Sequence, residues 1–347
     1  MAVVLSAKDF MSNRLEYSTA PVRTRRVALW ATALALCAGA VCPLAWAQSY
    51  PNRPIKLIAP YPAGGGVDAV ARLIGERLAT RLGQPIVVDN KPGAAATIGG
   101  DALAKSAPDG YTLMVGSITD YAIAPHVHKS LAFDMRKDFA PIVEMGYGTV
   151  ILVVSADFPP RNVKELIALA KSKPGELSFA SSGIGGLQHL NGEMFKQMAG
   201  VDLVHVPYKG TTQLLPDLLA GRVPMAIDSL PAHLPHIKSG KVRVLAVASA
   251  TRAATLPDVP TMAEAGLPGY ESATNYTLFA PAGTPKDIVA LLNKETNAVL
   301  QMPDVREKLQ AQGIVITGGS VESVERRIPR ELDKWTKVVK GSQLKFD

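Results

Sequence analysis

Residues 55–78, which read IKLIAPYPAGGGVDAVARLIGERL, decide the fold. The first five are mainly apolar and predict a short buried strand. From Val67 onward, apolar residues recur at helical spacing through Val70, Ile74 and Leu78, which predicts an amphipathic helix. A strand, a glycine-rich loop and a helix in this order are typical of an α/β fold.

The same alternation continues along the chain. Short apolar runs predict strands over residues 86–88, 111–115, 149–154, 177–180 and 242–247. Helices are predicted over 97–105, after the capping pair Asn162 and Glu165, and after Thr284, which we expect to cap its helix together with Pro285 and Asp287. A last apolar stripe begins near residue 320. This pattern predicts α/β layers with mostly parallel sheets.

The chain carries a formal charge of +7, from 37 Lys and Arg and 30 Asp and Glu among 347 residues. Its basic residues are dispersed, and no basic stripe with interleaved aromatic residues is found, so we expect no nucleic-acid partner. The two cysteines, Cys37 and Cys42, are too few for a disulfide scaffold and lack the spacing of zinc ligands.

Residues 1–47 have the pattern of a secretory signal peptide. Basic residues 23–26 precede an apolar run over 27–41, and Ala45-Trp46-Ala47 supplies a small-x-small cleavage site. The run is short for a membrane anchor, which needs about 18–20 residues. We therefore expect export to the periplasm and cleavage after Ala47, with translation starting at Met1 or Met11. The remaining 300 residues hold 32 basic and 28 acidic side chains, a net charge of +4, and no cysteine.

Two loops between a strand and a helix stand out, APYPAGGGVD at residues 59–68 and ASSGIGGLQH at residues 180–189. Helix starts offer unpaired N–H groups and the positive end of the helix dipole, and glycine lets a ligand approach the backbone. Such loops suit a carboxylate or a phosphate. Neither loop contains Lys or Arg, so recognition would depend on backbone amides and hydroxyls. Each loop can equally be a tight structural turn.

A dinucleotide-binding site and a hydrolase site are less well supported by the sequence than anion binding by the two loops. Asp89 follows the first loop at the distance expected for a dinucleotide site, but Gly64–Gly66 is not G-x-G-x-x-G, and no phosphate-binding P-loop motif occurs. Ser181 or Ser182 with His189 could belong to a hydrolase, but no G-x-S-x-G motif is present. We therefore predict no catalytic residues, no cofactor and no enzyme activity.

Two pairs of histidines at short spacing could in principle bind a metal ion. The pairs are His126 with His128 and His233 with His236. Neither has an evident third ligand in the sequence, so we predict structural roles and no metal site.

The chain then resembles a known family, through motifs that occur in a fixed order. The Bug family (Bordetella uptake gene type) comprises the substrate-binding receptors of tripartite tricarboxylate transporters. The resemblance covers nearly all of residues 48–347, and its motifs are PYPAGGGVDAVAR at 60–72, VDNKPGA at 88–94, PDGYTL at 108–113, SGIGGLQH at 182–189, VPYKG at 206–210, DLLAG at 217–221 and APAGTP at 280–285.

The resemblance implies a type II periplasmic-binding-protein fold, in which two α/β lobes close around a ligand cleft. On this basis we expect one lobe to comprise residues 48–149 and 275–347, and the other to comprise residues 150–274. The expected function is capture of a small organic carboxylate and its delivery to a membrane permease, by a protein that acts as a monomer. A ligand sensor for a membrane signalling partner is the alternative.

The ligand-binding residues that the resemblance implies lie in both loops. They are Ala63, Gly64, Gly65 and Asp68 in the first, and Ser181, Ser182, Gly183, Gly185 and His189 in the second. Asp68 would repel a carboxylate directly, so we expect it to orient water or a ligand N–H. Gly186 and Asn275 depart from the family pattern, which more often has Ser and Trp there, and both departures bear on which ligand fits.

Overall fold

The computed structural model describes residues 50–128 and 130–342. The expected signal peptide, residues 1–47, lies outside the described residues. No helix in the two described ranges is both long enough and apolar enough to span a membrane.

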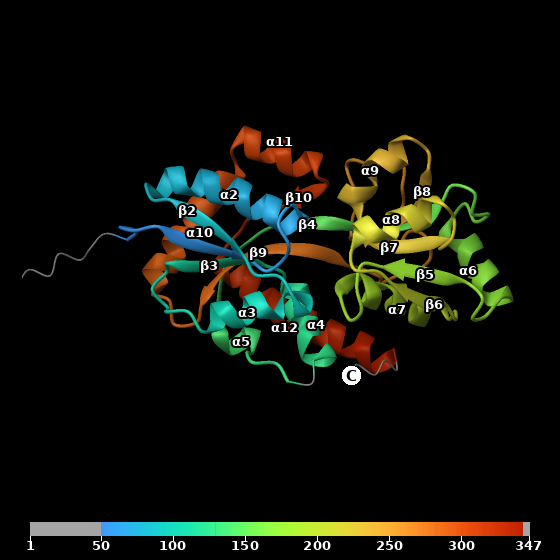
Figure 1. Ribbon diagram of the computed structural model, residues 1–347, viewed down its shortest axis with the longest axis horizontal. Coiled ribbons are helices and arrows are strands. Elements are labelled where there is room, and N and C mark those ends of the chain that lie inside the picture. Colours follow the sequence, from blue (N-terminus) through green and yellow to red (C-terminus); the bar gives the residue numbers. More distant parts are fainter. Residues whose placement is uncertain (1–49, 129, 343–347) are drawn as a thin grey trace, which may run out of the picture. The chain divides into compact units, whose positions relative to one another are not determined.

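Strands and helices alternate along the chain, as expected (Figure 1). The strands are β1 (Ile55–Ala59), β2 (Ile86–Asn90), β3 (Thr112–Gly116), β4 (Phe139–Ser155), β5 (Ser178–Ser181), β6 (Val204–Pro207), β7 (Met225–Ser229), β8 (Val242–Val247), β9 (Ala273–Pro281) and β10 (Ile314–Ile316). The helices are α2 (Gly66–Leu82), the short 3₁₀ turn η1 (Ala94–Ala96), α3 (Thr97–Ala104), α4 (Ile118–Val127), α5 (Met135–Asp138), α6 (Val163–Ser172), α7 (Leu187–Ala199), α8 (Thr211–Leu219), α9 (Leu230–Lys238), α10 (Lys286–Leu300), α11 (Pro303–Ala311) and α12 (Val321–Gly341).

The strand β4 belongs to two sheets. Over residues 139–149 it pairs with β9, and over residues 150–155 it pairs with β7 and β8. The first sheet has the order β2-β1-β3-β9-β4, with β10 on the other side of β4. The second contains β4, β7, β5 and β6 in that order, with β8 beside β4. Figure 1 shows β4 and β9 running between the two sheets.

Both sheets are mixed, and the parallel strands are the ones that carry the two loops. The strand β1 is parallel to β2 and β3, and β5 is parallel to β6 and β7. The pairings of β4 and β9 are antiparallel. The expectation of mostly parallel sheets therefore describes the loop-bearing strands, while the two long strands add antiparallel ladders.

Apolar side chains cover both faces of both sheets. One cluster packs α2, α10 and α11 on the first sheet, through Ile74, Leu292 and Leu309. A second cluster continues from α4 and α12 on the opposite face to α6 and α7 of the second sheet, and it includes the fully buried Trp335. A third lies under α8 and α9. Helices on both faces of each sheet are the layers expected of an α/β fold.

Two helix starts test the capping predictions. The Asn162 Oδ1 accepts from the Glu165 N–H at 2.9 Å, and Glu165 Oε2 accepts from the Arg161 N–H at 2.7 Å, so the capping prediction for α6 is confirmed. The prediction for α10 is wrong, because Thr284 Oγ1 donates to the Pro281 carbonyl at 2.7 Å and no side chain caps the helix.

The predicted strand 149–154 is only the end of β4. Residues 139–148 contain Pro141, Gly146 and Gly148, which favour turns in a sequence read alone. The pairing of β4 with β9 shifts register near Pro141 and again near Gly146. These irregularities accommodate the proline and the glycine within a continuous ladder.

Candidate functional site

The two glycine-rich loops have the same backbone where their helices begin. Gly64 and Gly185 have φ of 82° and 72°, in the left-handed region that favours glycine. The next residues, Gly65 and Gly186, are the N-caps of α2 and α7, with φ and ψ of −80° and 170° in one and −80° and 173° in the other. The structure therefore builds two equivalent helix starts from unrelated stretches of sequence.

Asp68 holds the first loop from within α2. Its Oδ2 accepts from the Gly64 N–H at 2.9 Å and from Arg72 Nε at 3.0 Å, and its Oδ1 accepts from Asn90 Nδ2 at 2.9 Å. Burial opposes ionisation of this carboxyl, but the three hydrogen bonds outweigh burial and lower its pKa to about 2. With only 3% of Asp68 exposed, its side chain braces the loop.

His189 holds the second loop in the same way. Its Nδ1 accepts from the Gly185 N–H at 3.0 Å, which repeats the bond between Gly64 and Asp68 four residues apart. Its ring stacks on His205 with centroids 3.7 Å apart and planes 9° apart. Burial, aided by the charge of Lys196, lowers the pKa of His189 to about 4. One loop therefore has a carboxylate brace and the other a neutral imidazole brace.

Ser181 pairs with His205 rather than with His189. Ser181 Oγ lies 2.7 Å from His205 Nε2 and 3.0 Å from the Gly183 carbonyl oxygen, and the serine is fully buried. The hydrolase interpretation weighed Ser181 or Ser182 with His189, whereas this hydrogen bond joins Ser181 to His205. His205 was missed because β6 places it beside β5, where Phe179 is its register partner. The serine is enclosed and orients the loop.

The other predicted binding residues differ in their exposure to solvent. Ala63, Gly64 and Gly65 are exposed, Ser182 and Gly183 are half-buried, and Gly185 is buried. The N–H groups of Gly66, Val67 and Asp68 in α2 have no acceptor within residues 50–128 and 130–342. Open N–H groups at the start of a 17-residue helix can bind an anion.

A phenol from the crossing strand β9 reaches the start of α2. A Cβ placed on Gly66 would lie 3.3 Å from the Tyr276 hydroxyl oxygen, and one placed on Gly148 would lie 3.1 Å from it. Tyr276 is 5% exposed, and its hydroxyl has no hydrogen-bond partner in the described part of the chain. Burial and the nearby Asp120 raise its pKa to about 12, so the phenol keeps its proton and remains a donor. Sequence reasoning missed this residue.

Asp120 lies beside the same loop. It accepts a very short hydrogen bond from Tyr61, the residue that enters the first loop, and its N–H donates to the helix cap Ser117. Burial raises its pKa to about 6, although hydrogen bonding of the carboxyl to the side chains of Tyr61 and Ser117 opposes the shift. The first loop therefore adjoins two phenols and a carboxyl that is partly protonated near neutral pH.

A family model described as "Tripartite tricarboxylate transporter family receptor" matches residues 70–344. The chain belongs to this receptor family. The family consists of transporter receptors rather than enzymes, which agrees with the expected absence of catalysis. The resemblance to Bug receptors is confirmed as well.

Three relatives of the receptor show how far the similarity extends. It is 38% identical to the protein BugT of Bordetella pertussis over 311 residues, covering 89% of this chain and 95% of BugT. The structure of R. palustris Rpa4515 with adipate is 38% identical, with a TM-score of 0.77, and the match covers 84% of this chain and 98% of that one. MatC of Rhodopseudomonas palustris with bound malate is 33% identical, with a TM-score of 0.74, and the match covers 84% and 100%. The two-lobe periplasmic-binding-protein fold is therefore shown for the receptor.

Asn275, one departure of the receptor from the family pattern, belongs to a buried polar network. Its Oδ1 accepts from Thr119 Oγ1 at 2.5 Å, and its Nδ2 donates to Glu144 Oε1 at 3.1 Å. Arg327 donates to both oxygens of Glu144 at 2.8 and 2.9 Å. Glu331 accepts from Trp335 Nε1 at 3.0 Å and from Thr119 at 3.3 Å. The network joins α4, α12 and the crossing strands β4 and β9.

The second departure, Gly186, leaves open space. A Cβ at this N-cap would meet no heavy atom within 4 Å. A serine would fit at this position without a clash.

The histidine pairs proposed from the sequence do not come together as ligands in the receptor. His126 shares a 2.9 Å hydrogen bond with Thr336, and the buried His233 lies 3.1 Å from Asp228. Among the residues with described positions, no three histidine, cysteine, aspartate or glutamate side chains gather to hold a metal.

Proposed function

We propose that this receptor captures a small organic carboxylate in the periplasm and delivers it to a tripartite tricarboxylate-type permease. The paired helix starts, with identical glycine caps and equivalent braces, carry this proposal. A carboxylate group placed at either helix start would accept hydrogen bonds from open N–H groups, and no cationic side chain would be needed. Adipate and malate, bound in the Rpa4515 and MatC structures, identify the ligand class to test first.

The proposed ligand site combines both loops. Ala63 and Gly65 contact the ligand from the first loop, beside the open N–H groups at the start of α2, and Ser182 and Gly183 contact it from the second. Gly64 and Gly185, whose N–H groups are taken by Asp68 and His189, give the two loops their shape. Asp68, Ser181 and His189 act by holding these loops in place. A ligand that contacts both lobes favours the closed arrangement through its differential affinity for the two states. The permease then recognises the closed receptor.

The lobes are proposed to comprise residues 48–149 with 275–347, and residues 150–274. The change of partner along β4 near residue 150 supports this division, as does the start of β9 at Ala273. We also propose export by the N-terminal signal, action as a monomer and no nucleic-acid partner. Sedimentation of the protein lacking residues 1–47 tests the oligomeric state.

Ligand-dependent stabilisation tests the function. Ligand-stripped protein is titrated with adipate, malate and a panel of mono-, di- and tricarboxylates while thermal unfolding is followed. At a hundredfold excess over the Kd, a true ligand should add about 2.7 kcal/mol of stability. Native mass spectrometry of the protein as purified would identify a carried ligand. If the whole carboxylate panel left the unfolding temperature unchanged, the carboxylate assignment would be lost.

Replacing Asp68 with alanine should weaken ligand binding about tenfold, because Gly64 loses its acceptor and the first loop loses its fixed shape. The unfolding free energy should also fall by about 1–3 kcal/mol, since Arg72 and Asn90 lose a shared partner. Calorimetric titration gives the affinity. Asp89→Ala, on the neighbouring strand β2, is the control. An unchanged affinity in Asp68→Ala would show that the brace is not needed.

Replacing Tyr276 with phenylalanine should reduce affinity three- to tenfold and leave stability nearly unchanged, because the hydroxyl has no partner in the described chain. A neutral hydrogen bond contributes about 0.5–1.5 kcal/mol, which sets this range. Tyr270→Phe is the matched control, since the Tyr270 hydroxyl donates to the Asn191 carbonyl at 2.8 Å. That variant should lose stability and retain affinity. If Tyr276→Phe instead lost stability and kept its affinity, Tyr276 would not belong to the ligand site.

A further inference from the structure

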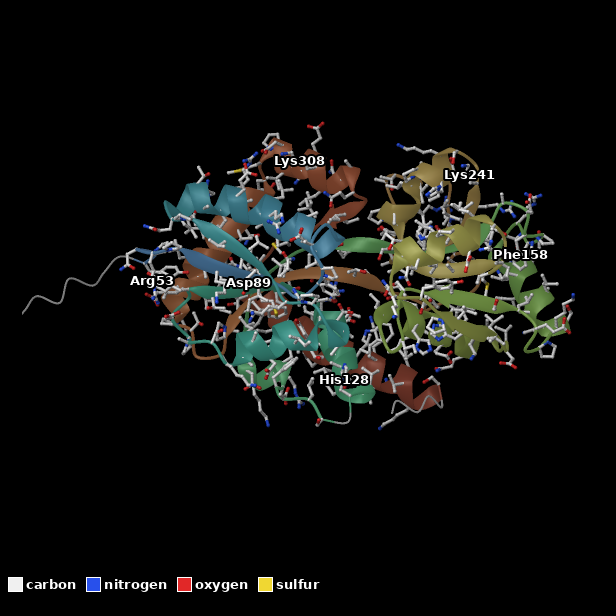
Figure 2. The ribbon with its side chains drawn as sticks, in the orientation of Figure 1. Arg53, Asp89, His128, Phe158, Lys241 and Lys308 are labelled. Carbon is white, nitrogen blue, oxygen red and sulfur yellow. The ribbon has the colours of Figure 1, made fainter. Side chains whose placement is uncertain are left out.

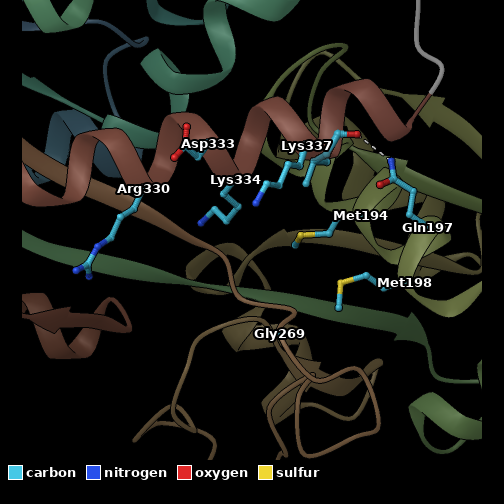
Figure 3. Close-up of a pocket in the computed structure, with 9 residues that line it drawn as sticks. Met194, Gln197, Met198, Gly269, Arg330, Asp333, Lys334 and Lys337 are labelled. Carbon is cyan, nitrogen blue, oxygen red and sulfur yellow. Dashed lines mark hydrogen bonds between the residues drawn. The ribbon is translucent and has the colours of Figure 1, made fainter.

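A groove lies between α7 and α12, apart from the two ligand loops. It has a volume of about 500 Å³, with Met194, Gln197 and Met198 on α7 and Arg330, Lys334 and Lys337 on α12. Figure 3 shows Lys334 and Lys337 on the side of α12 where Met194 and Met198 lie, with Arg330 further along the helix. We call this feature the α7–α12 groove. Gln197 Nε2 donates to the Val338 carbonyl at 2.9 Å and ties the two helices together.

The wall formed by α12 is a line of positive charge. Arg330 and Lys337 are exposed and have no ion-pair partner among the residues described, whereas Lys334 pairs with Glu331 at 2.8 Å. Asp333 is the one acidic residue that lines the groove. Arg330 and Lys337 are seven residues apart, or about 10 Å along the helix axis. A line of this length fits charges spaced along an extended or helical segment better than one compact anion.

The wall formed by α7 is apolar and adaptable. Met198 is 39% exposed, whereas Met194, one helical turn earlier, lines the groove but is only 4% exposed and belongs to the core. Unbranched, polarisable methionine side chains suit surfaces that bind apolar side chains of another protein. The two walls together fit a segment with acidic residues along one side and apolar residues along the other.

The helices that form the groove also connect to the second loop and to the buried polar network. The helix α7 starts at the second loop, and His189 in its first turn braces that loop. The helix α12 carries Arg327 and Glu331, which hold β4 and α4 in the buried network. A displacement of α7 relative to α12 on ligand binding would therefore change the groove.

We propose that the α7–α12 groove docks an acidic segment of the membrane permease, with its apolar side chains on the methionines. The inference depends on the proposed transport function. Charge complementarity favours this partner, because the cations on α12 have few acidic neighbours of their own. An acidic periplasmic loop of the permease would meet the unpaired Arg330 and Lys337 and the exposed Met198 in one docking event.

The test uses synthetic peptides that cover the periplasmic segments of the tripartite permease subunits from the same organism. Fluorescence anisotropy measures their binding to the full receptor without its signal. We expect an acidic, partly apolar peptide to bind, with an affinity that falls as salt rises. Arg330→Glu/Lys337→Glu should weaken it at least tenfold, and Met198→Ser about threefold. Uptake by the reconstituted permease should fall in parallel.

The matched control is Lys238→Glu/Lys241→Glu, which reverses two exposed charges beside α9. Figure 2 shows Lys241 on β8's side of the second sheet, away from α12. This variant should bind the peptide within twofold of the unmodified receptor. Equal losses in both charge-reversal variants, or none in either, would overturn the proposal.

Two further measurements separate failure of the groove assignment from failure of the proposed transport function. Binding to phosphatidylglycerol vesicles in place of any peptide, abolished by Arg330→Glu/Lys337→Glu, would overturn the proposal in favour of a lipid surface. The carboxylate thermal shift is recorded on the same variants and should be unchanged. Normal carboxylate binding with unaltered uptake overturns the groove assignment alone. Absence of any carboxylate shift in the unmodified receptor overturns the proposed function instead.

Discussion

Replacing Arg327 with methionine should lower the unfolding free energy by about 3 kcal/mol, the low end for breaking a buried ion pair. The substitution leaves Glu144, which is 7% exposed, with Asn275 as its remaining donor. Arg327 is itself about 29% exposed, so solvent reduces the loss below that of a fully buried pair. Thermal unfolding should begin roughly 6 °C lower.

The loss should depend on pH. Burial already raises the pKa of Glu144, although Arg327 and Asn275 oppose the shift. Without Arg327 this pKa rises further, so the folded variant binds a proton more readily than the unfolded chain does. Stability of the variant therefore increases as pH falls. We expect the difference from the unmodified protein to be larger at pH 8 than at pH 5.

Arg326→Met is the control, because Arg326 is exposed on the same helix. It should change the unfolding free energy by about 0.5 kcal/mol or less. Chemical unfolding of both variants at pH 5 and pH 8 gives the comparison. A loss below 1 kcal/mol in Arg327→Met at pH 8 would contradict the role assigned to the network.

Acidification to pH 4 should release the ligand because the second loop loses its brace, while the first loop keeps its shape. Protonated His189 cannot accept the Gly185 N–H through Nδ1, so that brace is lost. Asp68, with a pKa of about 2, continues to accept from Gly64 at this pH. The two equivalent helix starts therefore differ in their acid sensitivity.

The direction in which stability changes with pH follows from the lowered pKa of His189. The unfolded chain takes up the His189 proton near pH 6.5, whereas the folded protein takes it up at about 4. Stability is therefore complete above pH 6.5 and falls as pH drops toward 4, by on the order of 3 kcal/mol. Burial, His189 and Lys196 lower the pKa of His205 to about 3, so His205 extends the loss below pH 4. Glu193 Oε1 faces this ring pair and lies 3.9 Å from His189 Nε2.

His189→Asn separates this effect from titration of the ligand itself. Asparagine retains an acceptor for Gly185 but does not titrate. Its affinity should fall less between pH 7 and pH 4 than that of the unmodified receptor, measured with the same carboxylate. His236→Asn, at the far end of α9, is the control. Identical pH profiles for all three proteins would contradict the proposed brace.

Local sequence patterns predicted the layers and missed the strand that connects them. The loop-bearing strands and the helices after them have strong apolar periodicity, so their order was correct. The first half of β4 was missed because Pro141, Gly146 and Gly148 favour turns locally. Pairing with β9, which is more than a hundred residues away in sequence, overrides that preference.

The predicted site was incomplete for a related reason. Motif order identified both loops, and the structure adds what Asp68 and His189 hold. His205 and Tyr276 come from strands outside the loop motifs. Their positions depend on the register of β6 against β5 and on the crossing of β9 past Gly66. Sequence spacing cannot give either arrangement, because both are set by strand pairing.

Because β9 lies between β3 and β4, it also decides which of the two sheets can form first during synthesis. All strands of the second sheet have been synthesised once Val247 is made, so that sheet can form early. The first sheet must wait for β9, and until then β3 and β4 present unpaired edges that invite aggregation. A chain that crosses a membrane before it folds has both partners available together. We therefore expect truncated or stalled chains that lack residues 273–281 to aggregate through the first sheet.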